Sequence, residues 1–220
     1  MQRSKRWWMW ACAGSIVGAV PQAGPATALM TERNAKAQEK RLQEVRALMV
    51  ESVANRVTID DGDLETVATL KTAEVFLPKR GGFFDTLLAD NMLRAMVGKS
   101  TGRTHWQLYQ TIHHTDPDWR NLQSVNYATP DGPRNAPLTA INSDVECKYG
   151  VCSRDEVVGF DVTEELLEAI VAHHAGKPDA VWRFKFNARN GIDWTDDIPV
   201  TEIAGALLAV KRYRAQKGFE

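Results

Sequence analysis

Apolar and polar side chains alternate strictly over residues 182–189. The apolar positions are Trp182, Phe184, Phe186 and Ala188, and the positions between them are Arg183, Lys185, Asn187 and Arg189. A period of two places the two sets on opposite faces of a β-strand. Asn190 and Gly191 follow, and this pair is typical of a tight hairpin turn. We therefore predict a strand with one buried face, which pairs with the segment that begins near Ile192.

Earlier segments have the same character. Short β-rich stretches separated by turn residues occupy residues 57–59, 64–77, 92–97, 105–114, 119–128, 138–147 and 155–162. Asp61-Gly62, between the first two stretches, is a hairpin signal. Residues 92–97 also suit a short helix, but the turn that follows at residues 99–102 favours a strand.

Two helices are predicted within this β-rich region. Thr163 can cap a helix over residues 164–174. The last helix begins near Pro199 or Thr201 and ends in basic residues. Both have one apolar face, so we expect both to cover a sheet.

A further helix is predicted near the N-terminus, over residues 31–55, with Thr31 as its cap. Its apolar stripe consists of Leu42, Val45, Met49 and Val53. The first half of this segment is charged and lacks the stripe, so the second half is expected to dock on the domain. The stripe is too short for a coiled coil, which makes pairing with another copy the weaker interpretation.

These patterns predict one fold class: mainly β, antiparallel and sandwich-like, with two packed amphipathic helices and an N-terminal helix, or α+β by count. The expected domains are a signal peptide at residues 1–28, an N-terminal helix at residues 29–56 and a β-rich domain at residues 57–220.

Residues 1–28 have the layout of a secretory signal peptide. A basic head at residues 3–6 precedes an apolar segment at residues 7–20, and small residues lead up to Ala28. That order predicts cleavage between Ala28 and Leu29. The apolar segment is shorter than the roughly 20 residues of a membrane span. We therefore expect a periplasmic or secreted protein with no transmembrane segment in the mature chain.

The cysteine usage agrees with export. Cys147 and Cys152 are the cysteines that remain after cleavage, and we predict that they form a disulfide across a tight hairpin, where paired positions lie about 5.5 Å apart. Cys12 suggests a lipid anchor as an alternative to cleavage after Ala28. This alternative is weaker, because Cys12 precedes most of the apolar segment instead of following it.

The chain has 27 basic and 28 acidic side chains, and cleavage leaves 24 against 28. This balance predicts no binding to nucleic acid.

The sequence offers weak candidates for catalysis or metal binding. His113, His114 and Asp116 lie close together, but neighbouring strand residues point to opposite faces. At most one of the two histidines can join Asp116, which is fewer than the three or four ligands that zinc requires. The chain has no Gly-x-Ser-x-Gly elbow and no Gly-rich phosphate loop, so we predict no catalytic residue, no metal and no cofactor.

A candidate anion-binding face lies on the polar side of the strand at residues 182–189. Its members are Arg183, Lys185 and Arg189, and nearby tryptophans could help to bind an anionic or sugar-like ligand. The weightier interpretation is that the basic residues are solvated and the tryptophans are core.

Two functions of different class remain. The favoured one is a non-enzymatic exported protein that binds a ligand or a protein partner as an envelope component. The alternative is a hydrolase or metal-dependent enzyme whose site is dispersed in the sequence, with His113, His114 and Asp116 as its candidates.

Overall fold

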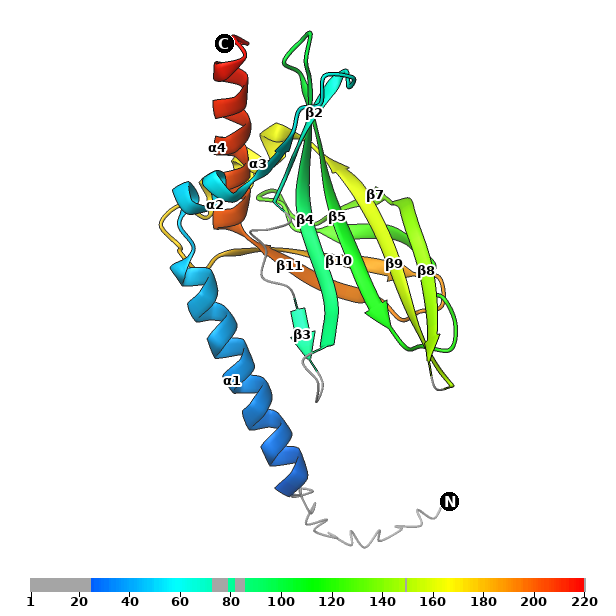
Figure 1. Cartoon of the computed structure of the whole chain (residues 1–220). Helices are drawn as coiled ribbons and strands as arrows, with labels where there is room; N and C mark the ends of the chain where they lie inside the picture. The colour runs from blue at the N-terminus through cyan, green and yellow to red at the C-terminus, as the bar shows by residue number, and fades with distance from the viewer. Residues whose placement is uncertain (1–24, 73–78, 82–85, 149, 220) are drawn as a thin grey trace, which may run out of the picture. The chain divides into compact units, whose positions relative to one another are not determined.

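The alternation seen in the sequence builds two antiparallel sheets in the computed structural model, which describes residues 25–72, 79–81, 86–148 and 150–219 (Figure 1). The elements, in chain order, are α1 (Pro25–Ala47), α2 (Val50–Arg56), β1 (Thr58–Asp60), β2 (Val67–Lys71), β3 (Lys79–Gly81), β4 (Thr86–Gly98), β5 (Thr104–His114), β6 (Leu122–Tyr127), β7 (Arg134–Pro137), β8 (Thr139–Lys148), β9 (Val151–Val162), α3 (Glu164–His173), β10 (Val181–Ala188), β11 (Trp194–Pro199) and α4 (Val200–Gln216).

Hydrogen bonding sorts the strands into two layers. The larger sheet has the order β1-β2-β4-β5-β9-β8, with β3 paired to β4, and the smaller sheet has the order β11-β10-β6-β7. The predicted hairpin after Asn190 is present as the antiparallel pair β10 and β11. The prediction of a mainly antiparallel, sandwich-like fold with packed helices is confirmed.

Aromatic side chains fill the space between the sheets. Phe160 of β9 faces Phe184 and Phe186 of β10, with ring centroids 6.3 Å apart in both pairs. Trp182 is also buried, and its indole nitrogen donates a hydrogen bond to the Ala128 carbonyl. The period-two pattern therefore placed these rings correctly, because a strand with one covered face buries every second side chain.

The helices α3 and α4 pack against strands of the sandwich, and α2 packs on α4. Thr163 caps α3 as predicted, with its hydroxyl accepting a hydrogen bond from the Leu166 amide. The helices α2 and α3 both contact α4 (Figure 1). The contact between α2 and α4 depends on Gly205, since a Cβ atom there would lie 2.2 Å from Cγ1 of Val53. Only glycine permits so close an approach.

The predicted single helix over residues 31–55 is wrong in two respects. The structure has two helices there, and the first begins at Pro25, so Thr31 lies within α1 and does not cap it. Met49 has extended backbone angles (φ −118°, ψ 135°), which end the first helical segment before α2 begins. Val45 and Val53 are buried as the stripe predicted, whereas Leu42 and Met49 are exposed. The break changes which side chains face the domain, and periodicity alone does not reveal a break that lacks proline or glycine.

The division between two compact units falls between Glu39 and Lys40, inside α1. Most of the predicted signal peptide, residues 1–24, lies outside the described residues, and Ala28 and Leu29 lie within α1. Cleavage between them stays a prediction, as does the domain boundary at residues 56 and 57.

Candidate functional site

A cavity of about 510 Å³ opens between the edge strand of the larger sheet and the ends of the two central strands of the smaller sheet. We call it the edge cavity. Its lining residues are Trp119, Asn121, Leu122, Gln123, Ala140, Asn142, Ser143, Glu156, Val157, Val158 and Arg189. They come from β6 and the loop before it, from β8 and β9, and from the end of β10. The volume lies within the range of about 300–1,000 Å³ that small-molecule sites occupy.

Irregular backbone surrounds the edge cavity. The pairing of β8 with β9 shifts register between Ala140 and Asn142, and the pairing of β10 with β6 shifts between Asn187 and Ala188. Asn121 has a φ of 52°, in the left-handed region that most side chains avoid. Strand bulges and such backbone conformations are enriched at binding sites, where they redirect side chains.

Glu156 forms part of the cavity wall and holds the loop before β6 in place. One of its carboxylate oxygens accepts hydrogen bonds from the Arg120 amide (2.6 Å) and from Nε2 of His114 (3.0 Å). The other accepts a hydrogen bond from the amide of Asn121 at 3.0 Å. The carboxylate, 6 % exposed, thus has three donors, which compensate for its burial.

His114 lies directly behind Glu156, on the same inner face of the larger sheet. Its Nδ1 is 3.3 Å from a carboxylate oxygen of Asp116, although the pair lacks the alignment of a hydrogen bond. Asp116 also accepts a hydrogen bond from Nε of Arg120 at 2.8 Å. The structure therefore brings together His114 and Asp116, as the sequence allowed, and adds Glu156 and Arg120.

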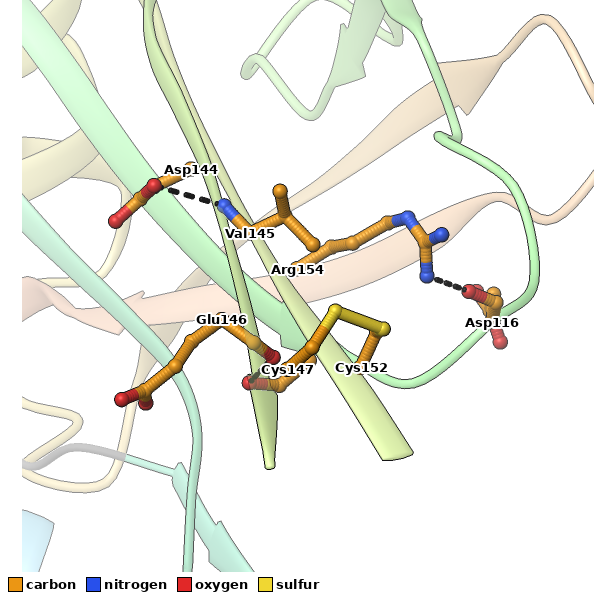
Figure 2. The surroundings of a disulfide bond; sticks show 8 residues. Asp116, Asp144, Val145, Glu146, Cys147, Cys152 and Arg154 are labelled. Atoms are coloured by element: carbon orange, nitrogen blue, oxygen red, sulfur yellow. Dashed lines mark hydrogen bonds between the residues drawn. A yellow bond between two sulfur atoms is a disulfide. The ribbon is translucent and has the colours of Figure 1, made fainter. Parts of the chain in front are cut away.

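Trp119 is a fixed part of the cavity wall. The guanidinium of Arg154 lies over its ring at 5.7 Å from the centroid. Its carbonyl oxygen accepts hydrogen bonds from the side-chain amides of Asn121 and Asn190, both at 3.3 Å. Arg154 itself reaches from β9 to the Asp116 carbonyl (Figure 2). The loop that carries Trp119 is thereby tied to both sheets.

The three basic residues of the predicted anion-binding face lie in different surroundings. Lys185 makes an ion pair with Asp193 at 2.9 Å, and Arg183 lies exposed on β10. Arg189 directly follows β10, next to the register shift between β10 and β6, and lines the edge cavity. One member of the predicted set therefore lines the candidate site, and the other two, which lie four and six residues earlier along the chain, do not.

The predicted cysteine pair lies at the end of the β8–β9 hairpin (Figure 2). Cys147 and Cys152 are directly opposite in the ladder and form a disulfide. Their Cα atoms are 4.0 Å apart, closer than the spacing that we expected for paired strand positions. Such a pair is typical of proteins in oxidising compartments.

His113 lies on the opposite face from His114, as alternation predicted. Its Nδ1 contacts a carboxylate oxygen of Asp155. Among the described residues, no group of three or more histidine, cysteine, aspartate or glutamate side chains has the arrangement of a metal site.

A second hollow, of about 550 Å³, lies beside α3, but its main charged groups pair with each other. Arg214 binds both oxygens of Glu164 at 2.7 Å, and Trp106 donates to the same carboxylate at 3.0 Å. These bonds from Arg214 and Trp106 outweigh burial, so the pKa of Glu164 lies below its usual value. The network ties α3 to α4 and β5, which favours a structural role.

Comparison with known proteins adds no information about function, because no family model, no curated protein and no solved structure matches the chain. None of the helices in the described part of the chain is long and apolar enough to cross a membrane.

Sequence reasoning missed Glu156 as a site residue, although a signal was present. Glu156 is in phase with Val158, Phe160 and Val162 along β9, so alternation assigns it to the buried face. A carboxylate at a buried position requires hydrogen-bond donors. This requirement marks Glu156 as a residue with nearby polar partners.

Proposed function

We propose that the protein is exported and works as a non-enzymatic envelope component that binds a small polar ligand in the edge cavity. One observation carries the proposal: two strand bulges and the left-handed Asn121 all border a single cavity with a polar lining. Regular strands would have been sufficient to close the sandwich. The irregular ones place polar groups around an open space.

Export is supported by the leader pattern and by the cysteine pair. A basic head, an apolar segment and a small-residue end precede Leu29. The Cys147–Cys152 pair suits an oxidising compartment, such as the periplasm or the medium. A protein that folds there meets extracellular solutes, which are candidate ligands for the edge cavity.

Native mass spectrometry of protein recovered from the periplasm or the medium tests both parts of the proposal. We expect a chain that begins at Leu29, carries one disulfide and retains a small-molecule adduct. Ser143→Trp fills the edge cavity and should remove the adduct. Ser153→Trp is the matched control, because Ser153 is exposed on the neighbouring strand and does not line the cavity.

The binding function would be refuted if Ser143→Trp retained the adduct. It would also be refuted if the wild-type protein carried no adduct, even after incubation with excess extract from the periplasm or the medium. An intact N-terminus with Cys147 and Cys152 as free thiols would refute export.

A second candidate function, that of a hydrolase, rests on the contact between His114 and Glu156 at the cavity wall. A histidine–carboxylate pair can move a proton if one member reaches the substrate. The binding function is better supported, because the Glu156 carboxylate already accepts three hydrogen bonds that anchor its surroundings. If the wild-type protein converts the co-purified ligand into two products, as detected by mass spectrometry, the hydrolase function would be favoured.

A further inference from the structure

We propose that the ligand of the edge cavity is an acidic sugar, with its carboxylate bound by Arg189 and its ring packed against Trp119. This inference rests on the proposed function and specifies the chemical class of the ligand. It follows from the charges around the cavity, the aromatic ring in its wall and the type of polar groups beside that ring.

The charges around the cavity leave one cation available. The carboxylate of Glu156 is engaged by two backbone amides and His114, and Asp116 is engaged by Arg120. By contrast, the Arg189 side chain is exposed and makes no ion pair with any residue in the described ranges. An arginine in this state can bind a carboxylate through two parallel hydrogen bonds. The edge cavity therefore favours an anion with a single carboxylate.

The lining beside Arg189 indicates more than a bare anion. Trp119 is held by Arg154 over its ring and by two amides at its carbonyl, so little entropy is lost when a ligand packs against it. An indole ring offers an apolar surface to the C–H face of a pyranose. A cavity of about 510 Å³ also exceeds what an inorganic anion needs.

Three polar side chains complete the cavity wall. Gln123, Asn142 and Ser143 line it, and in the described part of the chain their side chains make no hydrogen bonds to other residues. Amides and hydroxyls each provide donors and acceptors, as the hydroxyl groups of a sugar do. A carboxylated sugar is the class of ligand that uses the arginine, the indole and these three groups together.

Isothermal titration calorimetry of the full chain provides the test. The probes are glucuronate, galacturonate, N-acetylneuraminate and N-acetylmuramate, each paired with its methyl ester, which keeps the sugar and removes the charge. We expect at least one acid to bind about tenfold or more tightly than its ester. Arg189→Gln should abolish this preference, while Arg183→Gln, on the same strand but outside the edge cavity, should keep it. Trp119→Ala should weaken acid and ester by a similar factor.

Each other outcome overturns the inference. Equal binding of acid and ester, or an unchanged preference in Arg189→Gln, would show that Arg189 does not select charge, while the binding function would stand. Failure of every probe to bind would exclude acidic sugars as the ligand class. The adduct seen by native mass spectrometry would then decide separately whether the binding function also fails.

Discussion

Two glutamates are buried in the domain, one on a strand and one on a helix, and their surroundings differ. Glu156 of β9 is 6 % exposed and accepts three hydrogen bonds. Glu202, in the first turn of α4, is fully buried, and neither of its carboxylate oxygens has a well-formed hydrogen bond to the described residues. Burial is the main reason why the pKa of Glu202 rises to about 8, and only a contact with Thr72 and two distant arginines oppose the rise.

The comparison shows that burial alone does not decide what a carboxyl group does. With three donors, Glu156 anchors the loop before β6, which borders the edge cavity. Glu202, whose oxygens lack well-formed hydrogen bonds to the described residues, is favoured as the neutral acid, because burial and the nearby Asp90 charge both raise its pKa. The two residues should therefore respond in opposite ways to the same substitution.

The largest effect is expected for the pH dependence of Glu202. Its pKa is about 8 in the folded chain, against an ordinary value of 4.5 for a glutamate. Between these values the unfolded chain has lost the proton and the folded chain retains it, so folding stability should fall as pH rises from about 4.5 to about 8. At about 1.4 kcal/mol per pKa unit, the loss is up to about 5 kcal/mol.

Glu202→Gln should remove this pH-dependent loss. We expect the variant and the wild-type protein to unfold at similar denaturant concentrations at pH 4.5 and the variant to be more stable by a few kcal/mol at pH 8. Urea unfolding at a series of pH values measures the difference. A constant difference across this range would mean that Glu202 does not retain a proton in the folded chain.

The second effect concerns Glu156 and has the opposite sign. Glu156→Gln replaces one acceptor oxygen by an NH₂ group, which then faces a backbone amide donor. We expect a loss of about 2–3 kcal/mol in the free energy of unfolding. Glu168→Gln, an exposed change of the same kind on α3, should shift stability by less than about 0.5 kcal/mol. Equal effects of both substitutions would contradict the anchoring role of Glu156.

The regular parts of the fold could be predicted from the sequence, because their signals are local. The spacing of two residues predicts a buried face that contains Trp182, Phe184 and Phe186. The capping side chain of Thr163 predicts the start of α3. The break at Met49 escaped prediction, because no proline or glycine marks it in the sequence.

The candidate site was only partly predictable. His114 and Asp116 are close in sequence, and the opposite orientation of His113 follows from strand alternation. The edge cavity, however, joins Trp119, Glu156 and Arg189 from distant segments. Their juxtaposition depends on strand order and on two bulges, and neither has a signature in a single sequence.

The smallest effect concerns Asn121, whose amide binds Glu156 while its φ of 52° lies in the left-handed region. Asn121→Ala and Asn121→Gly both remove the side-chain contact with Trp119, so their difference isolates the backbone conformation. A Cβ atom costs about 1–2 kcal/mol in this region, whereas glycine adopts it freely.

We therefore expect Asn121→Gly to be about 1 kcal/mol more stable than Asn121→Ala, as measured by urea unfolding. Combining each change with Glu156→Gln sharpens the comparison. If Glu156 holds the loop in its left-handed conformation, the difference between glycine and alanine should shrink once that acceptor is lost. A difference that persists unchanged would assign the conformation to the contacts between Arg189 and residues 120–121 instead, because the Arg189 amide also donates hydrogen bonds to those two carbonyls.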